Sequence, residues 1–112
     1  MALTPEKKIQ NKIMDYLKSL EAQGYKVYHE RRQALGQAYK EGLPDLWCTV
    51  NGLHIEIEIK QVGGSVRSRQ EKWERHFKSI GVIYLRPDCE QEIKDFFEKE
   101  LFRIIPPGDL KK

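Results

Sequence analysis

The sequence predicts an α/β fold in which a mixed sheet is flanked by helices, in the order helix, three strands, helix, strand, helix. Two observations carry this prediction. The apolar residues switch between helical spacing and period-two spacing along the chain, and Asn51-Gly52 separates two runs with strand-like alternation. The length of 112 residues fits one domain, which we assign to residues 1–105, with residues 106–112 as a tail that need not order.

The first helix is predicted to begin at Pro5 and to end near Gly24. Thr4 is a suitable N-cap, and proline is favoured at the first helical position. Glu6 lies on the same face as the apolar stripe. That stripe recurs at helical spacing and consists of Ile9, Ile13, Leu17 and Leu20.

A strand and a hairpin follow. Residues 25–30 are predicted to form a short strand, and residues 31–43 a polar loop punctuated by glycine. Strands over 44–50 and 53–60 are joined by Asn51-Gly52, the strongest short-range signal for a two-residue type I′ hairpin turn.

This hairpin brings Asp45 and Glu58 opposite each other on one face. Because Val50 pairs with Leu53 across the turn, facing residues have numbers that sum to 103, and successive side chains alternate between the faces. The face with both acids consists of Asp45, Trp47, Thr49, His54, Glu56, Glu58 and Lys60. The other face is predicted to be core and consists of Leu46, Cys48, Val50, Leu53, Ile55, Ile57 and Ile59.

A second helix is predicted from a capping box of Ser68 and Glu71 to a stop at Gly81. Gln70 shares the face of its apolar stripe. The stripe consists of Trp73, Phe77 and Ile80. Residues 82–86 are almost wholly apolar, which is typical of a strand in the interior of a sheet covered on both faces.

Asp88 is the predicted N-cap of a third helix, with Gln91 three residues on. Its core stripe consists of Ile93, Phe96, Phe97 and Leu101, and the apolar character continues at Phe102, Ile104 and Ile105. From Phe96 onward these side chains supply more apolar surface than one short helix can bury, so they are a candidate interface between two copies of the chain. The alternative is that they complete the core of a monomer.

Composition narrows the class of protein. Twenty Lys and Arg against 17 Asp and Glu give a formal charge of +3, which is compatible with a polyanionic partner but too small to establish one. No apolar run approaches the roughly 20 residues of a membrane span, and the first residues lack the layout of a signal peptide, so the cytoplasm is the expected location. Cys48 and Cys89 are predicted to be free thiols, and His29, His54 and His76 are not at metal-ligand spacing.

The facing acids Asp45 and Glu58 have the chemistry of a metal site. Two ionised carboxylates about 5 Å apart repel by roughly 3 kcal/mol at an effective dielectric near 20. A divalent cation compensates this best, because Mg²⁺ takes one or two protein carboxylates and completes its shell with water and phosphate oxygens. Lys60, two residues from Glu58 on the same face, could orient a water or offset charge on a phosphorane.

An ordinary structural interpretation competes with this one. Residues 55–60 alternate apolar and charged side chains, as an amphipathic strand with a solvated face does. Arg or Lys side chains from residues 31–43 could neutralise the two acids. Glu56 is either a second carboxylate near the metal or a solvated or salt-bridged side chain.

The ordered motifs of the chain favour the metal site. Pro44-Asp45, followed after twelve residues by Glu58-Ile59-Lys60, resembles the PD-(D/E)xK nuclease signature. Over about residues 4 to 87 the chain resembles the virus-type replication-repair nuclease (VRR-NUC) family, including its small stand-alone phage members. The motifs that carry this resemblance are Glu6 with Ile9-Gln10, Gly42-Leu43-Pro44-Asp45, Ile57-Glu58-Ile59-Lys60, Gly63-Gly64 and Gln70-x-x-Trp73. The resemblance implies a restriction-endonuclease-like fold.

The resemblance also implies roles for individual residues. The implied ligands of Mg²⁺ or Mn²⁺ are Asp45, Glu58 and the Ile59 carbonyl. Lys60 becomes the catalytic lysine, Gln70 the helix-two glutamine near the scissile phosphate, and Glu6 the helix-one acid near the metal. The residues by themselves leave an ordinary explanation open for two of these, since an acid is favoured at a helix N-terminus and Gln70 simply occupies a first turn.

The implied function is a metal-dependent, structure-specific DNA endonuclease that hydrolyses phosphodiester bonds in branched DNA, such as four-way (Holliday) junctions or flaps, in a bacterial or phage-infected host cell. Paired cuts across a symmetric junction call for two active sites, hence a homodimer. The candidate phosphate contacts are Arg31, Arg32, Lys40, Arg67 and Arg69; for the first three, a solvated loop is the alternative. The competing functions are a non-catalytic nucleic-acid-binding module on the same fold and a general DNA nuclease without junction preference.

Overall fold

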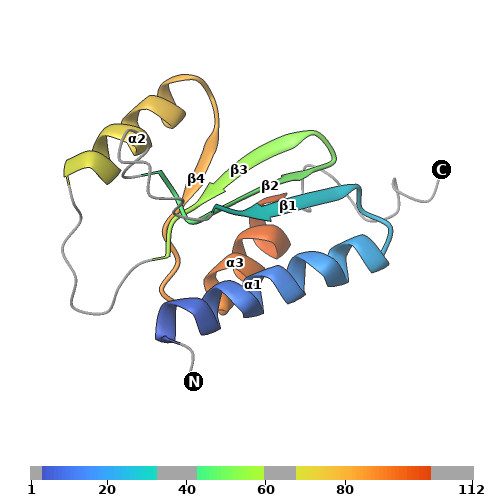
Figure 1. Cartoon of the computed structure of the whole chain (residues 1–112). Helices are drawn as coiled ribbons and strands as arrows, with labels where there is room; N and C mark the ends of the chain where they lie inside the picture. The colour runs from blue at the N-terminus through green and yellow to red at the C-terminus, as the bar shows by residue number, and fades with distance from the viewer. Residues whose placement is uncertain (1–3, 33–42, 60–67, 102–112) are drawn as a thin grey trace.

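The computed structural model describes residues 4–32, 43–59 and 68–101, and it contains a four-stranded mixed sheet flanked by helices (Figure 1). The strands are β1 (Val27–Arg31), β2 (Leu46–Val50), β3 (Leu53–Ile57) and β4 (Ile83–Leu85). The helices are α1 (Pro5–Ala22), α2 (Ser68–Ser79) and α3 (Glu90–Phe96), which continues as a π-helical turn, η2 (Phe97–Leu101). The predicted element order and mixed sheet are confirmed.

The helices cover the two faces of the sheet unequally. The strand order is β1-β2-β3-β4, with antiparallel pairing in the first two ladders and parallel pairing between β3 and β4. Helices α1 and α3 pack together on one face, and α2 packs over β4 on the other (Figure 1). The main core lies under α1 and α3, so the opposite face is left for other uses.

Helix α1 forms as its sequence predicts. The Thr4 hydroxyl oxygen accepts the Lys7 N–H at 3.2 Å, which satisfies one of the amide donors left open in the first turn. Ile13, Leu17 and Leu20 are buried against the sheet. Burial of each such side chain contributes about 1.5–3 kcal/mol, which fixes the orientation of the helix and of its first turn.

The hairpin also confirms its prediction. Val50 pairs with Leu53, and the pairs of the ladder have numbers that sum to 103 down to Leu46 and Ile57. Both turn residues of Asn51-Gly52 have positive φ, 49° and 88°, as a type I′ turn requires. The strands are shorter than the predicted 44–50 and 53–60, because regular pairing stops at the last of these pairs.

The prediction for residues 82–86 is half wrong. The strand is covered on both faces, since Ile83 and Leu85 pack against the main core and Tyr84 stacks on Phe77 of α2. However, β4 lies at an edge of the sheet formed by the described residues, not in its interior. Apolar side chains indicate that both faces of a strand are covered. They do not indicate whether the strand has a hydrogen-bonded neighbour on one edge or on both.

Two local predictions are also wrong. Ile80 is 61% exposed, because α2 ends at Ser79 and the chain turns away through Gly81, whose φ is 86°. Asp88 is not the N-cap of α3; Cys89 holds that position, and the Asp88 N–H donates to the Glu92 carboxylate at 3.1 Å. Cys89 makes no side-chain cap hydrogen bond, and Glu92 in the first turn instead binds the main chain that leads into the helix.

The remaining expectations concern cysteines and membranes. Cys48 is buried, Cys89 is partly buried, and both are free thiols as predicted. In the described ranges, no helix has the length and apolar character needed to cross a membrane.

Candidate active site

Asp45 and Glu58 lie at one end of the sheet, one residue beyond the last β2–β3 pair. At each acid the main chain is hydrogen-bonded to the segment on its other side, at the end of β1 for Asp45 and in β4 for Glu58. The Asp45 carbonyl accepts the Arg32 N–H at 2.8 Å, and the Glu58 N–H donates to the Leu85 carbonyl at 2.9 Å. The two acids predicted to face each other are therefore held by the strands on either side of them.

The two carboxylates have few hydrogen-bond donors. Asp45 Oδ2 accepts the Ile59 N–H at 3.2 Å. Glu58 is 7% exposed; its Oε1 accepts Gln70 Nε2 at 2.5 Å, while its Oε2 is buried and has no hydrogen-bond partner among the described residues. A buried carboxylate oxygen without a donor is costly, so this atom marks a position where a cation or a donor would be stabilising.

Burial raises the pKa of both acids. The pKa of Glu58 rises to about 8, first because the carboxyl is buried and then because Asp45 is close. The pKa of Asp45 is also raised by burial, and the Glu6 carboxylate adds to the rise, while the Ile59 N–H and the Arg32 charge oppose it. The site therefore disfavours two negative charges unless a positive charge joins them.

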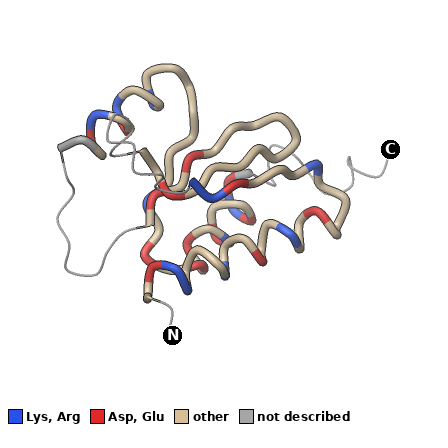
Figure 2. The backbone as a smooth tube through the Cα atoms, in the orientation of Figure 1, with Lys and Arg blue, Asp and Glu red and all other residues tan. Residues whose placement is uncertain are grey.

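Glu6 and Gln70 both reach this end of the sheet. Glu6, in the first turn of α1, acts electrostatically on Asp45 and Glu58. Gln70, in the first turn of α2, binds Glu58 directly. Figure 2 shows acidic positions at the start of α1 and at the nearby ends of the strands, with basic positions among them.

No three His, Cys, Asp or Glu side chains of the described residues form a group that could hold a metal ion. Glu6 therefore does not complete a three-carboxylate cluster with Asp45 and Glu58. The predicted ligand set is smaller, two carboxylates and the Ile59 carbonyl, and Mg²⁺ is commonly bound through one or two carboxylates. His54 lies against the Trp47 ring, and His76 lies against the rings of Trp73 and Phe77.

Glu56 is salt-bridged, which decides between the alternatives that the sequence leaves open. Its carboxylate is 1% exposed and forms a two-point ion pair with Arg32, at 2.5 and 3.0 Å. His54 Nε2 lies 2.5 Å from Glu56 Oε2. Glu56 is therefore a buried, salt-bridged side chain, and the Arg32 guanidinium neutralises Glu56 rather than Asp45 or Glu58.

Arg86 and Tyr84 are site neighbours that sequence reasoning missed. Arg86 forms an ion pair with Glu74 of α2, lies over the Tyr84 ring at 6.0 Å from its centroid, and lowers the pKa of Glu58. The Tyr84 hydroxyl and Arg86 Nε are buried and have no hydrogen-bond partners in residues 4–32, 43–59 and 68–101. No sequence signal could have found them, because the parallel register of β3 and β4 depends on a distant connection.

Gln10 is a further polar residue beside the site. It lies one turn after Glu6 on α1 and is buried, and no described residue hydrogen-bonds its Oε1. Gln10 follows Glu6 by four residues and precedes Ile13 by three, so helical spacing places it on the face of the apolar stripe, where it is buried with that stripe.

The predicted basic residues of the site fall partly outside the described ranges. Lys60, Lys40 and Arg67 lie outside the described residues. Arg69 belongs to the first turn of α2, and Arg31 is the last residue of β1 and is partly buried.

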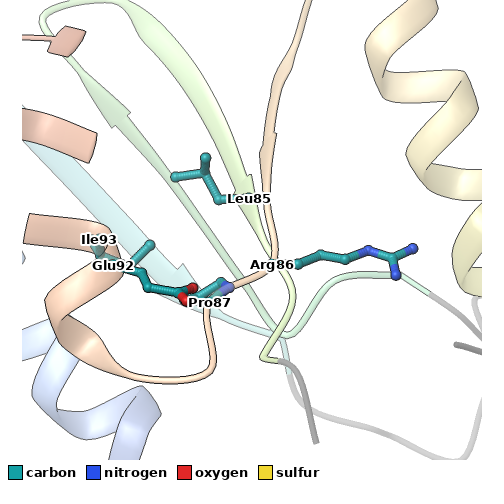
Figure 3. Close-up of a pocket in the computed structure, with 5 residues that line it drawn as sticks. All are labelled: Leu85, Arg86, Pro87, Glu92 and Ile93. Carbon is teal, nitrogen blue, oxygen red and sulfur yellow. The ribbon is translucent and has the colours of Figure 1, made fainter. Parts of the chain in front are cut away.

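A separate hollow of about 160 Å³ lies between β4 and α3. It is lined by Leu85, Arg86, Pro87, Glu92 and Ile93 (Figure 3). The Arg86 side chain extends away from the other four toward α2, and none of the predicted site residues lines the hollow. The candidate site is therefore the carboxylate pair on the α2 side and not this hollow.

The comparisons with known proteins identify the fold. No protein-family model matches the sequence, and no curated protein does. A solved structure described as a VRR_NUC domain superposes with a TM-score of 0.69, covering 88% of this chain and 99% of that chain at 16% sequence identity. At that identity the likeness is one of fold, and it confirms the restriction-endonuclease-like fold expected from the motifs.

Proposed function

We propose that this chain is a metal-dependent endonuclease that hydrolyses phosphodiester bonds in DNA. The observation that carries the proposal is the pair at the end of the sheet, partly buried Asp45 and buried Glu58, in which Glu58 Oε2 has no donor among the described residues. A fold shared with a VRR_NUC domain supports a nuclease of the PD-(D/E)xK type. Perturbed carboxyls in such a position are candidates for catalysis.

The residues fit a divalent cation. Two carboxylates with raised pKa values and an orphaned buried oxygen would both be relieved by Mg²⁺ or Mn²⁺. Asp45, Glu58 and the main-chain carbonyl of Ile59 would hold the ion. When bound, it would supply Lewis-acid stabilisation of the phosphate and lower the pKa of a water.

The other proposed residues act around that pair. Lys60 would carry a positive charge to the phosphate undergoing attack and offset the charge that develops there. Gln70 donates to Glu58 Oε1 and so orients that carboxylate, which makes it a positioning residue in this proposal. Glu6 would add negative charge that strengthens cation binding.

The DNA backbone would be held by basic residues. Arg31, Lys40, Arg67 and Arg69 are the proposed phosphate contacts, since Lys and Arg supply the charge that neutralises phosphates. Arg32 differs from these four because its guanidinium is already paired with Glu56.

The proposed substrate is branched DNA, such as a four-way junction or a flap, cut by a homodimer with two sites related by a two-fold axis. Of the six apolar residues considered for the interface, Phe97 is fully buried in the core of one copy and Phe96 packs against that core. The side chains of Leu101, Phe102, Ile104 and Ile105 lie outside the description. An interface would therefore rest on these last four.

The enzyme proposal is tested with purified protein, labelled four-way junction and linear duplex, with Mn²⁺ and with chelator. We expect metal-dependent cleavage of the junction that Lys60→Ala abolishes. Binding without cleavage by the wild type would instead support a non-catalytic nucleic-acid-binding module. Equal cutting of junction and linear duplex would leave a general nuclease.

Assembly is tested by light scattering at micromolar concentration, with and without junction DNA. We expect the mass of a dimer in at least one condition. A double variant, Ile104→Glu with Ile105→Glu, should reduce it to a monomer. A wild type that is monomeric in both conditions would remove the paired-cut version of the proposal.

A further inference from the structure

Arg32 holds the main chain on both sides of Asp45. Its backbone N–H donates to the Asp45 carbonyl at 2.8 Å, and its guanidinium Nη1 donates to the Pro44 carbonyl at 2.9 Å. These two carbonyls belong to the peptide groups that flank the Asp45 Cα. Fixing both peptide groups fixes the direction in which the Asp45 side chain leaves the backbone.

Glu56 in turn fixes the guanidinium. Both of its oxygens receive donors from Arg32, and the fork–fork geometry sets the plane as well as the position of the guanidinium. His54 contacts the same carboxylate and stacks on Trp47, with ring centroids 5.4 Å apart. The Glu56 carboxylate is almost wholly buried, so this arrangement has little freedom to relax into solvent.

The Asp45 carboxylate is poorly stabilised by its surroundings, so the contacts that hold its backbone are important. Among the described residues, the main-chain N–H of Ile59 is the only group that donates to the Asp45 carboxylate. Burial and the nearby Glu6 carboxylate both disfavour the negative charge of Asp45. A carboxylate in that position would turn away if its backbone were free to rotate. Groups that hold ligands in place typically change metal affinity by about 10–100-fold when they are removed.

We propose that Arg32 and Glu56 form a positioning pair that holds the Pro44-Asp45 backbone so that the Asp45 carboxylate stays aimed at the proposed cation site. Arg32 then serves the site through the protein and not as a phosphate contact. This inference rests on the proposed function for its consequence in metal binding, and on the contacts of Arg32 for the positioning itself.

Arg32→Lys is the discriminating variant. Lysine keeps the positive charge but lacks the planar fork, so it cannot bind both Glu56 oxygens and the Pro44 carbonyl together. A phosphate contact would largely survive this change. A positioning role would not, and Glu56→Gln should reproduce the defect although it adds no positive charge to the protein surface.

The first measurement needs no metal. Hydrogen exchange of the Ile59 amide reports whether the Asp45 carboxylate still accepts its N–H. We expect exchange at Ile59 to accelerate about 10-fold or more in Arg32→Lys and Glu56→Gln relative to the amides of α1 in the same variant, which report any general loss of stability. Glu30→Gln is the matched control, because Glu30 is an exposed acid on the neighbouring strand that contacts Tyr28; it should leave the Ile59 rate unchanged.

The second measurement is Mn²⁺ binding by calorimetry without DNA, together with the salt dependence of junction binding in chelator. We expect both variants to bind Mn²⁺ about 10–100-fold more weakly and to keep the wild-type salt slope. To separate positioning from stability, the double variant Arg32→Met with Glu56→Leu replaces the ion pair by apolar side chains, which often restores stability. It should melt near the wild-type temperature and still bind Mn²⁺ weakly.

The outcomes distinguish this inference from the proposed function. If the wild type does not bind Mn²⁺, the proposed function fails, and the Ile59 exchange rates alone decide whether the pair positions Asp45. If the wild type binds Mn²⁺ and Arg32→Lys keeps both the affinity and the Ile59 protection, the positioning pair is overturned. A salt slope that falls by about one in Arg32→Gln but not in Arg32→Lys would identify Arg32 as a phosphate contact instead.

Discussion

Glu56 and Glu58 are two residues apart in the chain and both are buried, yet their surroundings are opposite. Glu56 receives both guanidinium donors of Arg32 and lies against His54. Within the part of the chain that the structure describes, Glu58 accepts the Gln70 amide at one oxygen and has no partner at the other, and its pKa is raised to about 8. Burial alone therefore does not mark a functional carboxylate. The mark is burial without compensation, which costs stability and is retained where it serves a purpose.

The largest expected effect is the loss of DNA cleavage when Glu58 is replaced. Glu58→Gln removes a proposed metal ligand, so we expect cleavage of junction DNA to fall by more than the roughly 10–100-fold that loss of an outer-shell group costs. Asp45→Asn should behave alike. The assay is single-turnover cleavage in Mn²⁺, with Glu30→Gln as the control that keeps wild-type rates. Wild-type cleavage by either amide variant would break the comparison.

The second effect is on stability, where we expect the replacement of Glu56 to cost more than the replacement of Glu58. Glu56→Gln removes the charge that pairs with Arg32, so we expect the free energy of unfolding to drop by about 1–3 kcal/mol. The raised pKa of Glu58 favours its uncharged form below about pH 8, and Glu58→Gln keeps that position uncharged at every pH, so the metal-free protein should be as stable as the wild type or more so. Urea unfolding in chelator measures both. A clear loss of stability in Glu58→Gln would indicate that this acid has a structural partner.

The third effect is a pH dependence that belongs to Glu58. Its ordinary pKa is 4.5, and in the folded metal-free protein the value is about 8. Between these values the unfolded chain releases the proton while the folded protein keeps it, so the stability from this group falls as the pH rises. Below the first value and above the second its contribution is constant.

Urea unfolding at several pH values between 5 and 8 tests this slope, with the wild type and Glu58→Gln compared in chelator. We expect the variant to lose the part of the slope that falls with pH. Identical slopes in the two proteins would mean that Glu58 is compensated in solution as Glu56 is in the structure.

The smallest effect compares two neighbouring arginines. Arg32 is paired with Glu56, whereas Arg31 makes no ion pair with the described residues. If Arg31 contacts phosphate, Arg31→Gln should weaken DNA binding for all sequences and reduce the salt slope by about one. Fluorescence anisotropy at several salt concentrations checks this. An unchanged slope would remove Arg31 from the proposed DNA contacts.

Local patterns in the sequence were sufficient for the helix, the hairpin and the carboxylate pair. The Thr4 cap, the apolar stripe of α1 and the Asn51-Gly52 turn are each decided by interactions within a few residues. Because a two-residue turn fixes the register of both strands, Asp45 and Glu58 could be paired by counting from it. The family resemblance implied a place near this site for Gln70, and in the structure Gln70 donates to Glu58.

Tertiary structure decided what surrounds that pair. Arg32 reaches Glu56 across 24 residues, and Arg86 reaches Glu74 between a strand and a helix, so neither pairing leaves a periodic signal. The edge position of β4 and the exposure of Ile80 were mispredicted for the same reason, since they depend on which segments meet and not on local spacing. The sequence by itself determined where the acids lie along the strands, because backbone geometry is local. Only the folded chain decided which acid is neutralised and which is left uncompensated, because charges pair through space.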